Sequence, residues 1–316
     1  MATAPELDPP AVAALGDRIS RNVASAVKVP ADTLRHVVVS VLAEGHVLIE
    51  DYPGVGKTAL ARALARSVDA EWSRIQCTAD LLPADVVGTN VFNQRENRFE
   101  FRPGPVFANV VLVDEINRAS PKTQSGLLEC MQERHVTVDK HTHELARPFV
   151  VLATQNPVEY EGTYPLPEAQ LDRFMARVSL GYPDADSEAQ MLAEHADHDR
   201  VLDLEAVTEL SEVVAAQEAV ARVHTSDALR RYVVAILDAT RSDPRVELGA
   251  SPRAGLMLLK AAKARAALDT RDHALPDDVQ AMAGAVLTHR LLLAPEAADR
   301  ERANVVRDAL DRVPAL

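Results

Sequence analysis

The sequence is poor in cysteine, in aromatic residues and in long apolar runs. Its two cysteines, Cys77 and Cys130, are too few and too far apart for a disulfide framework or a Cys-X-X-Cys site, which fits a reducing cytoplasm. Aromatic residues make up 4% of the chain, and alanine, leucine and valine dominate, as in packed helices and parallel sheets. No apolar stretch approaches the ~18 residues of a membrane span.

Basic residues are also scarce relative to acidic ones. The formal net charge is −13, whereas binding to DNA or RNA without sequence preference needs a basic surface, so only a local basic patch stays open. Residues 1–10 are acidic and rich in proline and lack the basic and then apolar segments of a signal peptide, so we expect none. With 316 residues and 47% hydrophobic content, two domains with an ample core are expected.

The most informative segment is residues 50–58, Glu-Asp-Tyr-Pro-Gly-Val-Gly-Lys-Thr, directly after the apolar run 47–49. A strand, a glycine-rich turn and Lys-Thr at the start of a helix form the arrangement that holds nucleotide phosphates, because backbone N–H groups and the helix dipole face the anion. We expect Lys57 to reach the β- and γ-phosphates and Thr58 to hold Mg²⁺. The other expected nucleotide contacts are Pro53, Gly54, Val55, Gly56 and Ala59. The alternative is a β-turn that happens to precede a helix.

Asp51 stands where this motif usually has its first glycine. That glycine serves the turn, and aspartate tolerates turn conformations better than most residues. The departure leaves the loop geometry open but not the nucleotide. Tyr52 is a further change whose effect the sequence does not explain.

Apolar runs that alternate with helical patterns predict a parallel sheet with helices on both faces. Residues 11–44 read as helical, and a further helix is expected at 57–68. The predicted strands are His46–Glu50, Trp72–Cys77, Val110–Val113, Phe149–Ala153 and Arg177–Leu180. Ligands of such sheets bind beyond the carboxyl ends of the strands, which is where we expect the motifs to lie.

Two insertions interrupt this alternation. Residues 85–107 contain a period-two pattern at 98–102 and predict a β-hairpin arm with its turn at 94–97, and residues 135–148 predict a second hairpin with its turn near residues 140 and 141. The spacing of His135, His141 and His143 matches no common zinc site, so we expect these histidines to face solvent.

After residue 183 the strand-like runs disappear, and residues 187–310 read as almost wholly helical. Ser251 is an expected N-cap with proline at the first helical position, and Pro276 opens another helix. We therefore expect an α/β nucleotide-binding core over residues 1–183 and a small all-α domain over residues 184–316.

Polar residues follow two of the predicted strands. Asp114 and Glu115 end a hydrophobic strand, which suits Asp114 to the Mg²⁺ shell and Glu115 to polarising the attacking water. Asn156 ends the next strand, where it would orient that water or touch the γ-phosphate. The alternatives are a solvated acidic pair and an Asx turn before Pro157.

Two arginines are candidates for further phosphate contacts. Arg173, near the start of the last strand, has the position of an arginine finger, and the alternative is a salt bridge to Asp172 or another nearby acid. If Arg173 is a finger, it acts on the nucleotide of a neighbouring subunit, and Arg177 is the first alternative. Arg253 lies in a first helical turn, where a cation opposes the dipole unless a phosphate faces it, so we expect an in-chain phosphate contact from the second domain.

Four runs of the sequence resemble the MoxR family of AAA+ ATPases. They are residues 74–83, 101–105, 113–119 and 162–174, and the match covers most of residues 25–295. By this resemblance Lys57 and Thr58 belong to Walker A and Asp114 and Glu115 to Walker B. Asn156 is then sensor 1, Arg173 the arginine finger and Arg253 sensor 2. The two insertions correspond to the helix-2 insert and the pre-sensor-1 hairpin, and the helical domain to a lid.

The resemblance implies an ATP- and Mg²⁺-dependent ATPase that forms a ring, usually a hexamer, with the ATP site between subunits. It further implies chaperone-like remodelling of client proteins, often metalloenzymes, together with a protein that bears a von Willebrand factor A domain. The rival interpretations are a nucleic-acid motor, a magnesium-chelatase-type subunit of the same clade, and an ATP-binding scaffold or switch without turnover. The negative charge disfavours the motor, and the presence of Glu115 and Arg173 disfavours the switch.

Overall fold

The computed structural model describes residues 6–156, 162–182, 185, 188, 199–298 and 300–315. At its centre lies a five-stranded parallel sheet in the order β2-β5-β8-β1-β9. The strands are β1 (Val47–Glu50), β2 (Trp72–Gln76), β5 (Val110–Asp114), β8 (Val150–Gln155) and β9 (Ala176–Val178). The parallel sheet expected from the sequence is confirmed. The last strand ends two residues before the expected boundary, because residues 179–181 turn to meet the loop after β1.

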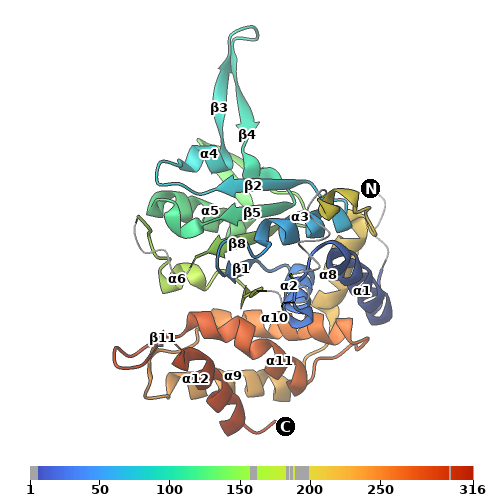
Figure 1. Ribbon diagram of the computed structural model, residues 1–316, viewed down its shortest axis with the longest axis vertical. Helices are drawn as coiled ribbons and strands as arrows, with labels where there is room; N and C mark the ends of the chain where they lie inside the picture. Colours follow the sequence, from blue (N-terminus) through green and yellow to red (C-terminus); the bar gives the residue numbers. More distant parts are fainter. Residues whose placement is uncertain are drawn as a thin grey trace.

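Helices cover both faces of the sheet (Figure 1). Among the described residues up to 182 the helices are α1 (Pro9–Ala26), α2 (Ala31–Leu42), α3 (Lys57–Ser67), α4 (Pro83–Val87), α5 (Pro121–Glu133) and α6 (Glu168–Leu171), with single 3₁₀ turns at Pro105–Phe107 and Ile116–Arg118. Asp8 caps α1 and Ser120 caps α5, each through a side-chain oxygen that accepts from a backbone N–H of the first turn.

The alternation of side chains along β1 divides the core in two. Val47 and Ile49 pack into one apolar cluster with α1, α2 and α3, whereas Leu48 packs into a second cluster with α5. All three are at most 1% exposed. A strand buried on both faces has no polar side, which is why the sequence shows a continuous apolar run there.

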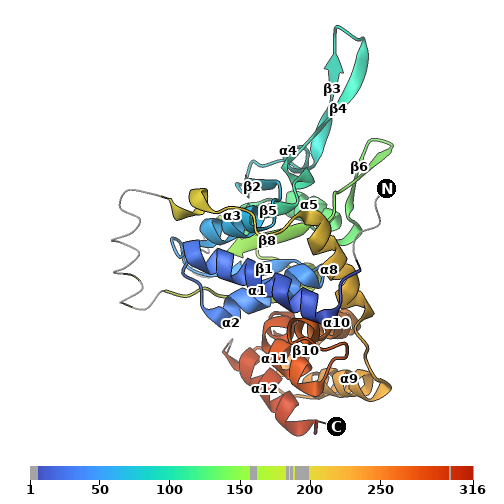
Figure 2. The same ribbon diagram turned by 90° about the vertical axis from the view of Figure 1, so that its right-hand side faces the viewer.

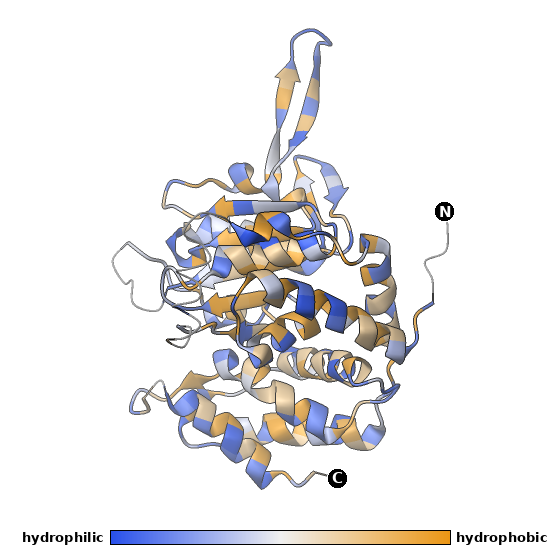
Figure 3. Ribbon diagram, turned by 45° about the vertical axis from the view of Figure 1, so that its right-hand side comes forward, coloured by the Kyte–Doolittle hydropathy of each residue, from blue (hydrophilic) through white to orange (hydrophobic). Residues whose placement is uncertain are grey.

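Both insertions form hairpins that leave the sheet (Figures 1 and 2). The arm consists of β3 (Gly88–Asn93) and β4 (Arg98–Pro103), with its turn at the expected residues, and the second hairpin of β6 (His135–Val138) and β7 (His141–Glu144). Along the arm apolar and polar residues alternate (Figure 3). His143 stacks on Phe101 at 3.9 Å between ring centroids, and no group of three or more metal-ligating side chains occurs among the described residues.

In the C-terminal part, a layer of helices lies under the sheet domain (Figure 1). It comprises α9 (Asp227–Arg241), α10 (Pro252–Leu268), α11 (Pro276–Leu287) and α12 (Glu301–Arg312), with a 3₁₀ turn at Thr288–Arg290. The helix α8 (Leu210–Arg222) lies beside the sheet domain against α1 and α2 (Figure 2), and a 3₁₀ turn at Arg200–Asp203 packs on α3. Ser251 caps α10 as expected. The expectation of an almost wholly helical region did not include the short pair β10 (Val246–Leu248) and β11 (Leu292–Leu293), because strands of two or three residues leave no period-two pattern.

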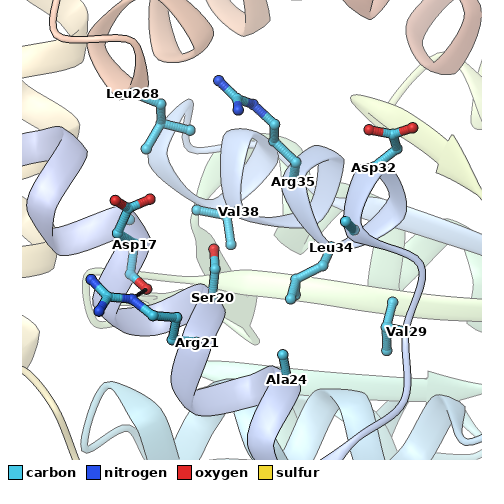
Figure 4. Close-up of a pocket in the computed structure, with 12 residues that line it drawn as sticks. Asp17, Ser20, Arg21, Ala24, Val29, Asp32, Leu34, Arg35, Val38 and Leu268 are labelled. Atoms are coloured by element: carbon cyan, nitrogen blue, oxygen red, sulfur yellow. Dashed lines mark hydrogen bonds between the residues drawn. The ribbon is translucent and has the colours of Figure 1, made fainter.

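Helix α10 joins the two parts, since it packs against α1, α2 and α8 as well as α9 and α11. The division at residue 183 stays a prediction. Beside this junction, a hollow of about 370 Å³ lies between α1 and α2 and is bordered by Leu268 of α10 (Figure 4). None of the expected site residues lines it. Among the described residues, no helix combines the length and apolar character that a membrane crossing requires.

Candidate functional site

The glycine-rich loop after β1 has the backbone that an anion site needs. Gly54 and Gly56 adopt positive φ values of 82° and 91°, which only glycine takes up without strain. Gly56 is the N-cap of α3, and Lys57 and Thr58 open that helix. Among the described residues, those that line the adjacent hollow of about 480 Å³ include Pro53, Gly54, Gly56, Lys57, Thr58, Ala59, Asp114, Glu115 and Asn156. The structure therefore brings nearly all the expected carboxyl-edge residues together at one place.

Lys57 occupies a resting position inside the loop. Its Nζ donates to the carbonyl oxygens of Asp51 at 2.8 Å and Tyr52 at 3.1 Å. Burial lowers the pKa of Lys57, while Asp114, Asp51 and Glu115 act in the opposite direction. A phosphate offers a stronger, charge-assisted acceptor than two neutral carbonyls, so its arrival would draw Lys57 away from them.

The two acidic residues after β5 are held in place by neighbouring strands. Asp114 accepts from the hydroxyl of Thr154 and from Arg74, both at 2.6 Å. Glu115 has φ 56°, an unusual value for a residue other than glycine, and its N–H donates to Thr154 at 2.9 Å. Strain of this kind persists where the surroundings fix it, and it is frequent at functional sites. Glu115 lines the hollow, and its carboxylate accepts from Gln76 Nε2 at 3.2 Å and pairs with Arg118 at 3.3 Å.

The donor set suits Mg²⁺. A hydroxyl, Thr58, and a carboxylate, Asp114, line the same hollow, and a hard cation that takes phosphate and water oxygens needs only one or two such protein ligands. Both carboxylate oxygens of Asp114 keep a second acceptor position beside the bonds from Thr154 and Arg74. The residues present therefore fit the cation that the motif implies.

Three lining residues escaped the sequence analysis: Arg62, Arg74 and Asp199. Arg62 pairs with Asp199 at 2.9 Å and lies over the ring of Trp72. Arg74 lies in a run that carries the family resemblance. Its position on β2, beside the end of β5, is the feature that could have predicted its contact with Asp114. Asp199 belongs to no motif, and only the folded chain brings it to the loop.

Arg173 and Arg253 lie elsewhere. Together with Lys260 they line a second hollow of about 290 Å³, next to Gly45 and His46, which precede β1, and Met175, which precedes β9. This hollow is at the amino edge of the sheet. Five residue steps separate His46 from Asp51, roughly 16 Å of extended chain. Arg253, in the first turn of α10, lines this hollow and not the one beside the loop, so the structure does not bring it to the in-chain phosphate site that we expected.

A buried hydrogen-bond network connects the segments that carry Arg173 and Arg253. Arg290, whose side chain is 1% exposed, donates to the Asp172 carboxylate at 2.7 Å and to the Phe174 carbonyl at 2.5 Å. Asp172 also accepts from Ser251 at 3.0 Å, and Ser251 caps the helix that carries Arg253. The alternative of an Arg173–Asp172 salt bridge is not what forms, since Arg290 and Ser251 hold that carboxylate. Nε of Arg173 is buried and has no hydrogen-bond partner within the part of the chain that the structure describes.

Arg177, the alternative finger, has a local role. It lies within β9 and pairs with Glu50 at 2.8 Å, and both side chains are partly buried. Glu50 is the last residue of β1, just before the phosphate-binding loop. This pairing favours Arg173 over Arg177 as the residue that reaches out of the chain.

Comparison with known proteins agrees with this geometry. Residues 46–176 match the model of the ATPase family associated with various cellular activities (AAA), and residues 238–309 match an AAA lid domain. The crystal structure of a Cytophaga hutchinsonii protein assigned as an ATPase superposes with a TM-score of 0.89 at 35% identity, covering 98% of this chain and 97% of the other. Fold and site thus define an AAA+ ATPase with a helical lid.

The curated relatives narrow this class. An uncharacterized Bacillus subtilis protein, YeaC, is 52% identical over 82% of this chain and 81% of its own length. Chaperone MoxR1 of Mycobacterium tuberculosis is 42% identical over 84% and 72%, and protein MoxR of Paracoccus denitrificans 34% identical over 90% and 88%. The chain belongs to the MoxR family of AAA+ ATPases, and it hydrolyses ATP.

Proposed function

We propose that this ATPase works as a chaperone that assembles into a ring, a hexamer as is usual in the family. Each ATP site in this ring is completed by residues of the neighbouring subunit. The observation that carries the proposal is the separation of the two hollows: the phosphate-binding loop is at the carboxyl edge of the sheet, and Arg173 and Arg253 are at the amino edge. Arg62 and Arg74 do line the loop hollow, but they are paired there with Asp199 and Asp114. A chain that holds Arg173 and Arg253 away from its own nucleotide site needs a neighbour to supply such arginines. In this proposal Lys57, Thr58 and Asp114 hold ATP and Mg²⁺, Glu115 and Asn156 orient water, and the neighbour's arginines stabilise the transferred charge.

The arm supports a protein as the substrate. Phe92 and Phe99 face each other across β3 and β4, 5.2 Å between ring centroids, and are 46% and 70% exposed. An exposed aromatic pair near the end of a projecting hairpin suits contact with another protein. Arg98 on the same arm pairs with Glu96 and Glu100, so it is partly neutralised and suited less well to nucleic acid.

The finer proposal follows the family. The client is a protein that needs activation, with metalloenzymes the expected class, and the partner bears a von Willebrand factor A domain. The chaperone name of the mycobacterial relative agrees with a remodelling role. Two free, buried thiols suit a reducing cytoplasm as the place of action.

A trapping experiment tests the partner and the client. Glu115→Gln should bind ATP without hydrolysing it and hold its partners, and Lys57→Ala, which should bind ATP poorly, is the matched control. We expect a von Willebrand factor A domain protein to co-purify with Glu115→Gln in the presence of ATP and not with Lys57→Ala. Equal recovery on both variants, or recovery of nucleic acid with DNA-stimulated turnover, would contradict the proposal.

A further inference from the structure

Asp51, the residue in place of the usual glycine, makes contacts that the motif does not require. It is 4% exposed, and its φ is not positive, so this position has no need of glycine in this loop. One carboxylate oxygen accepts from Ser179 Oγ at 3.0 Å and from the backbone N–H groups of Leu180 at 2.6 Å and Gly181 at 2.8 Å. The other accepts from the N–H of Tyr52 at 3.0 Å.

The segment that Asp51 holds is itself anchored. Thr33 of α2 donates to the carbonyl of Ser179 at 2.9 Å. Gly181 has a positive φ of 68°, and its N–H donates to Asp51. Directly after it, Tyr182 stacks on Tyr52 with the rings 16° from parallel and 5.7 Å between centroids. The loop is thus tied to residues 179–182 by a carboxylate and by an aromatic pair.

Asp51 also meets the phosphate-binding lysine. Its backbone carbonyl is one of the two acceptors of Lys57 Nζ. Because the carboxylate holds residue 51 in place, it also holds the carbonyl that Lys57 Nζ contacts. It likewise holds the start of the turn whose N–H groups would bind phosphate. A glycine at position 51 leaves the N–H of Leu180, which is buried, and that of Gly181 without this acceptor.

We propose that Asp51 is a positioning residue for nucleotide binding: its carboxylate latches the phosphate-binding loop to residues 179–181 and holds the loop ready for phosphate. The inference rests on the proposed nucleotide site and goes beyond it, since the motif assigns no task to a carboxylate here. The latch makes the loop rigid before the nucleotide arrives, so the ordering cost of binding is smaller. The same contacts connect the phosphate-binding loop to residues 179–181, which follow β9.

The test compares ADP affinity in the full-length protein by titration calorimetry. Asp51→Gly, which restores the usual motif, should weaken ADP binding at least about tenfold, and Asp51→Asn, which keeps an acceptor without the charge, less. Ser179→Ala should weaken it about threefold. The Asp51→Asn/Ser179→Ala double change should cost less than the product of the single effects, because both remove the same contact. In turnover assays the KM for ATP should rise more than kcat falls.

Asp243→Asn is the matched control, because Asp243 is a buried carboxylate, paired with Arg245 and Arg312, far from the loop in the lid. It should lower the melting temperature and leave ADP affinity unchanged. Wild-type affinity in Asp51→Gly would overturn the latch, as would an equal loss in Asp243→Asn. If Asp51→Gly does not fold, Asp51→Asn and Ser179→Ala carry the same test. ADP binding without turnover or subunit complementation would sink the proposed function and leave the latch standing.

Discussion

The two edges of the sheet differ in how complete they are. At the carboxyl edge, the acids meet cations of the same chain: Asp114 pairs with Arg74, and Asp199 pairs with Arg62. At the amino edge, Arg173, Arg253 and Lys260 line one hollow, where Glu44 is already paired with Arg134 and Arg147. One edge is built to receive an anion with its cation, and the other presents surplus positive charge. The difference supports the proposal that a neighbouring chain completes the site of reaction.

The largest effect is expected at the carboxyl edge. Glu115→Gln should bind ATP normally and lose at least about 10²-fold in turnover, because a neutral amide does not polarise water as a carboxylate does. Lys57→Ala should instead lose nucleotide affinity. Steady-state phosphate release and ADP titration separate the two. Equal turnover in wild type and Glu115→Gln would remove Glu115 from its role.

The amino edge is tested by Arg173→Ala. We expect ATP binding to stay intact and turnover to fall by up to about 10³-fold, the lower range for an arginine finger. Wild-type specific activity should rise with protein concentration, because assembly completes the site. Mixing Arg173→Ala with Lys57→Ala should restore activity, since mixed interfaces join an intact loop to an intact arginine.

Arg177→Ala is the control for this experiment, because Arg177 pairs with Glu50 inside its own chain. Its defect should show no recovery on mixing with Lys57→Ala. Two results would contradict this: wild-type turnover that does not depend on protein concentration, and no recovery when Arg173→Ala is mixed with Lys57→Ala. Together they would show that the arginine finger acts within its own chain and that the two edges do not belong to different sites.

A smaller effect is expected on the pH dependence of folding stability, through His46 at the amino edge. His46 accepts from the N–H of Val151 at 3.0 Å, lies 2.9 Å from the carbonyl of Met131, and burial lowers its pKa to about 4. Between pH 6.5 and 4 the unfolded chain takes up a proton at this histidine and the folded chain does not. Stability is therefore present above pH 6.5 and is lost as the pH falls, by about 2 kcal/mol at pH 5 from this group.

Urea unfolding at pH 7.5 and 5 measures the loss. Burial also lowers the pKa of His36 and His289, so the wild type should lose more than His46 alone contributes. His46→Gln should be less stable at pH 7.5 but show a smaller fall on acidification. An identical fall in both proteins would show that His46 does not stay neutral in the fold.

The smallest effect is expected at the cysteines, one near each edge. Burial raises the pKa of Cys77 and of Cys130 to about 12, so both thiols stay protonated and unreactive at neutral pH. The Cys77→Ser/Cys130→Ser double change should keep ATP turnover within about twofold, with some loss of stability from two buried hydroxyls. Loss of turnover in a well-folded double variant would reveal a role for a thiol at the site.

Local patterns were sufficient for much of the fold. The apolar runs predicted the central strands β1, β5 and β8, because a strand buried on both faces is apolar throughout. The alternation at 98–102 predicted the arm. The short strands β10 and β11 could not be predicted, since pairing across 44 residues rather than any local pattern creates them. Glycines, N-cap residues and prolines affect the backbone of adjacent residues, so their structural effects could be predicted from the sequence.

The sequence by itself determined the phosphate-binding loop, the acidic pair and the class of protein, because each depends on residues that are adjacent in the chain. Only the tertiary structure decided that Arg173 and Arg253 both lie at the amino edge. It also decided that Arg290 pairs with Asp172 and that Asp51 accepts hydrogen bonds from residues 179–181. These contacts join residues that lie 80 to 130 positions apart. Their partners are chosen by packing and by the demand that buried charges be paired, and neither is written in any single segment.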